Sequence, residues 1–194
     1  MQAQEVIEQF RAAGALLEGH FVLSSGLHSS RYLQSALVLQ NPAQAEEFGR
    51  AIAARFQDQN IKLVASPAIG GIIIGHEVAR ALGARFLWTE REAGAMTLRR
   101  GFSVSPGDRT LVVEDVITTG GSTRDTVETL RAAGAEVIAA ASIIDRSSGA
   151  ADVGVPRVAL ALLDVPSVEP SICEACRRGE PAIKPGSRKV GSRQ

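Results

Sequence analysis

The sequence predicts an α/β fold: a Rossmann-like, mostly parallel sheet flanked by helices, with a small N-terminal hood. From residue 41 onward, short apolar stretches alternate with longer segments whose apolar residues recur at helical spacing. Such alternation is typical of βαβ units and therefore of a parallel sheet. The chain has 194 residues, of which 45% are hydrophobic, so it has the size and the apolar content of one core. We therefore expect a single domain over residues 1–194.

The first 40 residues differ from that pattern. Apolar side chains at helical spacing predict a helix over residues 4–17. Residues 20–39, HFVLSSGLHSSRYLQSALVL, then show short β-rich pieces around a Ser-Ser-Gly turn. We interpret residues 1–40, together with the tail 165–194, as a hood beside a core of residues 41–164.

The elements of the core follow in alternating order. Pro42 suits the first turn of a helix, and Gly134 suits a helix end. Residues 90–108, mostly polar or small, are longer than an ordinary connection and are either a disordered insertion or an active-site lid. The tail from residue 181 has the composition of a frayed terminus. Helices are expected over residues 41–57, 70–83 and 122–135, and strands over residues 61–66, 85–90, 110–115, 136–145 and 158–164.

Composition limits the classes of partner. Lys plus Arg and Asp plus Glu both number 21, so the charge balance disfavours nucleic acid and favours a small-molecule ligand. No apolar run approaches the roughly 18 residues that span a bilayer, so we expect no membrane partner and a cytoplasmic protein. Cys173 and Cys176 supply only half of a closed zinc site. They would form a redox-sensitive pair, join a second copy's cysteines around zinc, or remain plain thiols, which we favour.

The stretch LVVEDVITTGGST, residues 111–123, carries the clearest chemistry. A loop between a strand and a helix turns successive backbone N–H groups toward one anion, and the helix N-terminus adds partial positive charge, so a phosphate would be held there. No Lys follows the glycines, which excludes a nucleoside-triphosphate P-loop. The acids Glu114 and Asp115 suit vicinal sugar hydroxyls, and Mg²⁺ can share such a site. Hydroxyl donors are Thr118, Thr119, Ser122 and Thr123, while Gly120 and Gly121 allow close approach of the backbone.

This stretch resembles the phosphoribosyl pyrophosphate signature of the type I phosphoribosyltransferases. The resemblance implies that Glu114 and Asp115 bind the ribose hydroxyls, that the loop holds the 5-phosphate, and that Mg²⁺ is the cofactor. SPAIGG, residues 66–71, resembles the pyrophosphate-binding loop of the family and places Ala68 and Gly70 there. Residues 90–108 occupy the position of its flexible lid.

Other segments point to the base. GHFVLSSGLHSSRYLQ and IIDRSSG are similar to segments of orotate phosphoribosyltransferases, and the lid and tail look like a bacterial subgroup found in Thermus and relatives. The resemblance implies that Tyr32 and Leu33 pack on the ring, that Thr118 contacts it, and that Arg146 binds the orotate carboxylate. A planar guanidinium suits that carboxylate.

The implied reaction converts orotate and phosphoribosyl pyrophosphate to orotidine 5-phosphate and pyrophosphate, in pyrimidine biosynthesis. The resemblance also implies a homodimer whose lid closes over the neighbouring subunit's site. Two alternatives are a phosphoribosyltransferase for another base and a nucleic-acid-binding regulator that senses phosphoribosyl pyrophosphate. The zero formal net charge argues against the regulator.

One departure concerns the leaving group. The family pattern has lysines in the lid and hood, where this chain aligns Gly94 and Ser24, and no lysine occurs from residue 63 to 183. Lys184 is another candidate cation, although a frayed tail is the favoured interpretation. His28 and His76 are interpreted as structural rather than as acid–base groups. The residues expected to act in catalysis are Arg91, Arg99, Arg100 and Asp115.

Overall fold

The computed structural model describes residues 1–23 and 26–184, and these residues form a core sheet and a smaller hood sheet. Within the described residues the core sheet has six strands in the order β5-β4-β3-β6-β7-β8. All neighbours pair in parallel except β5, which is antiparallel to β4. The predicted mostly parallel sheet is confirmed. The strands are β3 (Leu63–Pro67), β4 (Arg85–Glu92), β5 (Ala95–Leu98), β6 (Arg109–Ile117), β7 (Glu136–Asp145) and β8 (Arg157–Leu162).

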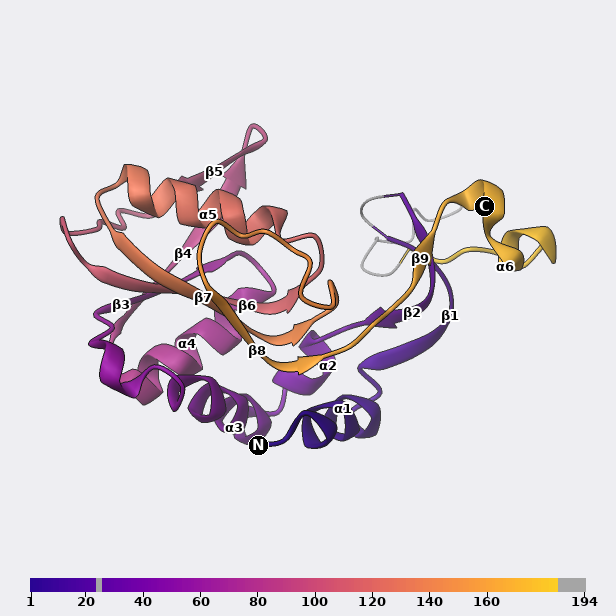
Figure 1. Ribbon diagram of the computed structural model, residues 1–194, viewed down its shortest axis with the longest axis horizontal. Helices are drawn as coiled ribbons and strands as arrows, with labels where there is room; N and C mark the ends of the chain where they lie inside the picture. The colour runs from indigo at the N-terminus through magenta and orange to yellow at the C-terminus, as the bar shows by residue number, and fades with distance from the viewer. Residues whose placement is uncertain (24–25, 185–194) are drawn as a thin grey trace, which may run out of the picture.

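Helices cover both faces of the core sheet (Figure 1). Helices α1 (Ala3–Ala12), α3 (Pro42–Ala53) and α4 (Gly71–Leu82) pack on one face, and α5 (Gly121–Ala132) packs on the other. Among the described residues, no helix has the combination of length and apolar character required for a membrane span. Short helical turns are α2 (Ala36–Leu39), η1 (Gln57–Gln59), η2 (Pro170–Ile172) and α6 (Glu174–Arg177).

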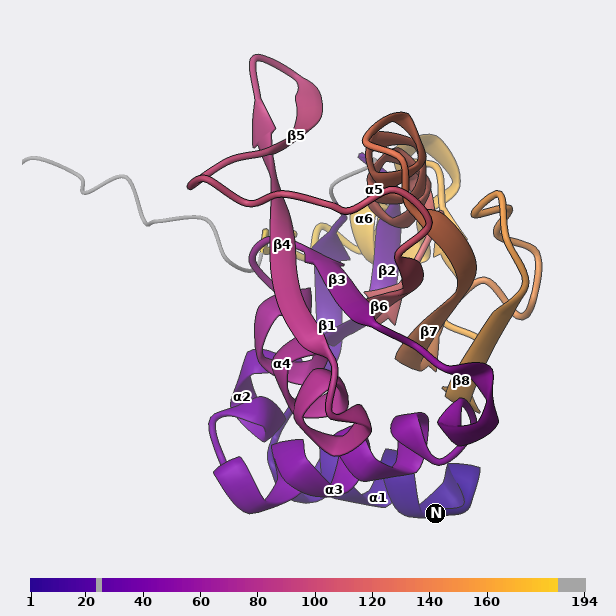
Figure 2. The same cartoon turned by 90° about the vertical axis from the view of Figure 1, so that its left-hand side faces the viewer.

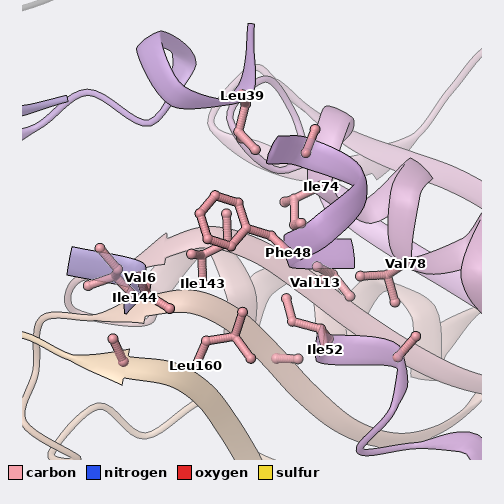
Figure 3. Close-up of a cluster of buried hydrophobic side chains, with 14 of the residues drawn as sticks. Val6, Leu39, Phe48, Ile52, Ile74, Val78, Val113, Ile143, Ile144 and Leu160 are labelled. Carbon is pink, nitrogen blue, oxygen red and sulfur yellow. The ribbon is translucent and has the colours of Figure 1, made fainter. Parts of the chain in front are cut away.

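Strand β6 shows why the sheet needs two helical layers. Its successive side chains point to opposite faces, so Leu111 and Val113 join one apolar cluster while Val112 joins the other. All three are fully buried. Figure 3 shows Val113 packed among Phe48 and other buried side chains of the first cluster. A strand buried on both faces reads as a continuous apolar run, which is what the sequence contains.

The hood sheet is antiparallel, in the order β1-β2-β9, and stands to one side of the core (Figure 1). Its strands are β1 (Leu16–Val22), β2 (His28–Leu33) and β9 (Ser167–Val168). The predicted helix over residues 4–17 is wrong at its end, because Gly14 at φ +64° follows the last turn. Leu16 and Leu17 therefore belong to β1.

The lid segment is more ordered than a loop. Strand β4 continues to Glu92 and turns through Ala93 and Gly94 into β5, forming a hairpin that projects from the sheet edge (Figure 2). Farther along, Phe102 and Val104 pack against the second apolar cluster. The hairpin therefore has an anchored base and a projecting tip.

The C-terminal segment returns to the hood. The Ile183 N–H donates to the His20 carbonyl at 2.8 Å, and the Val22 N–H donates to the Ile183 carbonyl at 2.9 Å. The segment is thus paired with β1 as far as Ile183, and the prediction that it frays from residue 181 is wrong for residues 181–184. Ser24 and residues 185–194 lie outside the described residues.

Candidate active site

A cavity of about 890 Å³ lies where the carboxyl ends of β6 and β7 face the hood. Ligands of parallel α/β sheets bind at this position. Residues from six separate segments of the chain line the cavity. Its polar and predicted lining residues are Tyr32, Leu33, Gln34, Ser35, Gly70, Asp115, Thr118, Thr119, Arg146, Ser147, Ser167 and Lys184.

The acid pair lies at the end of β6. Ser35 donates its hydroxyl to Asp115, and Thr123 donates its hydroxyl to Glu114 at 3.1 Å. Neither acid forms an ion pair with Lys or Arg among the described residues. Withdrawal from water raises the pKa of both carboxyls, and the negative charge of Asp115 raises the pKa of Glu114 further. Both groups are therefore suited to accept hydrogen bonds from a ligand or to face a cation.

The loop after β3 reaches the same acid. A Cβ atom on Gly70 would lie 2.7 Å from Asp115 Oδ1, so only glycine lets this backbone approach the carboxyl. Ala68, two residues earlier, is half-buried at the start of the loop. The predicted pyrophosphate loop and the acid pair are thus in contact.

The loop after β6 connects the cavity to the start of α5. Thr118 and Thr119 are exposed to the cavity. Gly120 has φ +79°, and a Cβ atom there would lie 2.8 Å from Val153 Cγ1, so both conformation and space require glycine. Gly121 and Ser122 follow, exposed at the start of α5. Their backbone N–H groups are available at the helix N-terminus, as phosphate binding requires.

Thr123 lies in the first turn of α5. Its side chain is only 1% exposed and its hydroxyl donates to Glu114. In this structure the hydroxyl faces the sheet, because the first turn of α5 directs it there. Thr123 positions one of the two acids.

Arg146 extends into the cavity from the end of β7. Burial lowers the pKa of its guanidinium, and its Nε atom is buried with no hydrogen-bond partner among residues 1–23 and 26–184. The turn that carries it is fixed by buried Asp145, which pairs with Arg157 at 3.1 Å and accepts from the Ser147 N–H at 2.7 Å. A planar cation held with unused donors is the arrangement that an anionic ligand group completes.

The three lid arginines lie outside the cavity, and each contacts a nearby acid. Arg91 pairs with Asp125 at 2.7 Å, and Arg99 pairs with Glu92 at 3.4 Å. Arg100 donates to Glu90 and lies 5.9 Å from the Trp88 ring. None of the three lines the cavity around Asp115.

Ser35 and Asp145 were not found from the sequence. Neither residue belongs to a recognisable motif. Ser35 contacts Asp115, which is distant in sequence, and Asp145 pairs with Arg157. Lys184, for which the sequence favours a frayed tail, lines the cavity. His76 is exposed and adjoins Glu77, whereas His28 is buried in the hood beside His20, outside this cavity.

Comparison with known proteins agrees with this geometry. Residues 35–159 match the phosphoribosyl transferase domain family, to which the chain belongs. An orotate phosphoribosyltransferase of Pelotomaculum thermopropionicum is 54% identical over 98% of this chain and 100% of its own length. One from Thermotoga maritima is 49% identical over 95% of this chain and 97% of its own length. Within the broader class, the chain belongs to the orotate phosphoribosyltransferase family.

Solved structures show the same fold. The crystal structure of orotate phosphoribosyltransferase from Aeropyrum pernix has a TM-score of 0.67 and 29% identity, covering 81% of this chain and 93% of that one. An adenine phosphoribosyltransferase from Rhodothermus marinus has a TM-score of 0.64 at 23% identity, covering 82% and 99%. Since enzymes for different bases share this fold, the fold alone does not choose the base.

Proposed function

We propose that this chain transfers the phosphoribosyl group of phosphoribosyl pyrophosphate to orotate, giving orotidine 5-phosphate and pyrophosphate in pyrimidine biosynthesis. The observation that carries the proposal is Arg146, whose guanidinium shares one cavity with Asp115 and Thr118. The guanidinium would give a charge-assisted contact to the carboxylate that distinguishes orotate from uracil. The sequence identity to orotate phosphoribosyltransferases supports the same base.

Each end of the donor sugar has a group of suitable chemistry. The N–H groups and hydroxyls from Thr118 to Ser122 would bind the 5-phosphate at the helix N-terminus. Glu114 and Asp115 would accept hydrogen bonds from the two ribose hydroxyls. These contacts would hold the anomeric carbon toward the base side of the cavity, where Tyr32 and Leu33 lie. Positioning of the two reactants is a large part of such catalysis.

The acid pair also fits Mg²⁺. Two carboxyls that are withdrawn from water and have no cationic side chain as ion-pair partner among the described residues offer the oxygen ligands that this ion prefers. Asp115, together with substrate oxygens, would hold the ion. Bound Mg²⁺ would supply positive charge against the developing charge of pyrophosphate. The backbone at Ala68 and Gly70 would bind that leaving group from the other side.

We further propose that the enzyme is a homodimer in which Arg91, Arg99 and Arg100 act in the neighbouring subunit's site. The support is geometric: the three arginines belong to a hairpin and its exit that leave the sheet edge, and none lines the cavity of its own chain. Their ion pairs are exposed and therefore weak enough to exchange for phosphate oxygens. We also propose a cytoplasmic location, which suits two neighbouring cysteines without a disulfide.

An absorbance assay tests the proposed reaction. With phosphoribosyl pyrophosphate and Mg²⁺, orotate should be consumed, while uracil, xanthine and hypoxanthine should not. Arg146→Gln should raise the KM for orotate by about 100-fold, because a charge-assisted contact is lost. Arg50→Gln, at an exposed position on α3, is the matched control. Turnover of a purine without turnover of orotate would contradict the proposal, as would nucleic-acid binding without any base turnover.

A further inference from the structure

Four side chains with metal-binding atoms meet at the end of the hood that faces α6. His20 comes from β1 and His28 from β2. Cys173 directly precedes α6, and Cys176 lies within it. One potential ligand atom of each lies within 4.8 Å of the others. Figure 1 shows the hood strands and the α6 segment side by side, far from α5 and the core sheet. The cluster is therefore separate from the cavity around Asp115.

The spacing matches a tetrahedral site. Zinc bonds of about 2.0–2.3 Å place ligand atoms roughly 3.3–3.8 Å apart. His20 Nε2 lies 3.5 Å from the Cys173 sulfur and 3.7 Å from the Cys176 sulfur. His28 Nδ1 lies 3.2 Å from the Cys176 sulfur. The His28–Cys176 distance is slightly shorter than that spacing. The two ring nitrogens, at 2.8 Å, are closer still, so an ion between them requires a shift of about half an ångström.

The ring of His20 is oriented for this role. Its Nδ1 lies 2.9 Å from the Glu180 carbonyl oxygen, which can only accept, so Nδ1 carries the proton. Nε2 is then the unprotonated nitrogen, and it faces both sulfurs. A backbone carbonyl that fixes the tautomer of a ligating histidine is a regular feature of metal sites.

The surroundings support a buried but reachable site. His20, His28 and Cys173 are buried, with exposed fractions of 6%, 8% and 6%. These three also line a second cavity of about 720 Å³, which gives an ion a path of entry. Cys176 is exposed, and both cysteines are free thiols.

We propose that His20, His28, Cys173 and Cys176 of one chain bind a structural Zn²⁺ ion. Two sulfur and two nitrogen ligands in tetrahedral arrangement suit zinc better than the oxygen-preferring ions such as Mg²⁺. Four protein ligands leave no open position for a substrate or water, so the ion has no role in the transfer reaction. On binding, the two thiols lose their protons to solvent and the histidines bind as neutral rings. The cysteine pair, which alone is half a site, is completed by histidines of the same chain rather than by a second subunit.

The ion would fasten the C-terminal segment to the hood. Cys173 and Cys176 precede the residues that pair with β1, and Ile183 forms backbone hydrogen bonds with His20 and Val22. Lys184 follows directly and lines the active-site cavity. Zinc would thereby hold Lys184 in place from outside that cavity.

Metal analysis of the full chain tests the site. The untagged protein, purified without chelators from zinc-supplemented medium, should contain one zinc per chain. Cys176→Ser and His20→Ala should each reduce that content at least tenfold, whereas His76→Ala, at an exposed histidine, should retain it. Cobalt in place of zinc should give the visible absorption of tetrahedral thiolate coordination, and this signal should be absent in Cys176→Ser.

Thiol reactivity of the wild-type chain gives an independent test, which does not depend on the folding of a variant. Both thiols should be protected from a thiol reagent until a strong chelator is added. Zinc content near zero with both thiols freely reactive would overturn the proposal. A Cys173–Cys176 disulfide in protein isolated under reducing conditions would also overturn it. Neither result would overturn the proposed transfer reaction, because the ion does not contact the substrates.

Discussion

Glu114 is suited to ligand binding but lowers the stability of the ligand-free protein. Its carboxyl is withdrawn from water and lies beside Asp115, so its pKa is raised well above the ordinary 4.5. In the unfolded chain the same group ionises at its ordinary pKa. Above the ordinary pKa, folding therefore opposes ionisation, and each unit of upward shift costs about 1.4 kcal/mol once the folded group is ionised.

We therefore expect Glu114→Gln to raise the Tm of the ligand-free protein at pH 8 while lowering activity. The sign follows from linkage: the wild-type acid contributes its full stability below pH 4.5 and loses it as the pH rises through the raised pKa. The difference in Tm between variant and wild type should shrink as the pH falls toward 4.5. Thermal unfolding at several pH values measures it.

Glu128→Gln, at an exposed position on α5, provides the control and should leave the Tm unchanged at each pH. A Glu114→Gln protein that is less stable than wild type at pH 8 would show that the carboxylate is stabilised in the free site after all.

At the scale of elements, the C-terminal segment joins the hood to the active site. Its last described residue, Lys184, enters the cavity because Ile183 is hydrogen-bonded to β1. The lid carries no lysine, so Lys184 is a cation that this chain can offer to an anionic substrate within the cavity.

Lys184→Ala should raise the KM for orotate or for phosphoribosyl pyrophosphate by about tenfold, the effect of losing one charge-assisted contact. A chain ended after Glu180 should lose at least as much, because the pairing with β1 is also removed. Lys62→Ala, at an exposed lysine beside β3, should keep wild-type kinetics. Steady-state kinetics of all three decide the matter, and unchanged constants for both tail variants would remove Lys184 from the site.

Elements of the core could be predicted from the sequence because their signals are local. The strand over residues 136–145 coincides with β7, and the stretch LVVED lies within β6. Leu16 and Leu17 continue the helical spacing of α1 by chance, and hood pairing decides their structure. The hairpin of residues 85–98 was missed because its second strand is short, half-exposed and gains its partner only from β4.

The candidate site divides in the same way. Thr118, Gly120 and Asp115 fall in one short stretch, so their shared location could be predicted. Ser35 and Lys184 reach Asp115 and the cavity only through the hood, and no pattern in the sequence records that contact. The cluster of His20 with Cys173 joins residues 153 positions apart, which spacing along the chain cannot reveal.

At the scale of the whole molecule, the lid hairpin and the cavity of one chain lie apart, and no lid arginine lines that cavity. The cavity is enclosed by the hood and the sheet, whereas Arg91 and Arg99 lie on a projecting hairpin paired with nearby acids. A dimer reconciles the two, since one subunit's hairpin can complete the other's site.

Subunit complementation tests this arrangement. The double variant Arg91→Ala, Arg99→Ala and the single variant Asp115→Asn should each lose about 100-fold or more in kcat. Co-expressed in equal amounts, they should recover about a quarter of wild-type activity, because half of the dimers then carry one intact shared site. No recovery, with mixed dimers confirmed by mass, would place the lid in its own subunit's site.

The hood also constrains the order in which the molecule can form during synthesis. Strands β1 and β2 leave the ribosome early, but β9 and the residues that pair with Phe21 leave it about 140–160 positions later. The N-terminal hairpin of β1 and β2 therefore lacks its later pairing partners while the core is being translated and folds. An edge kept unpaired for that long is open to association with other chains. The hood is therefore completed only after the core has been translated, and its edge is exposed until then.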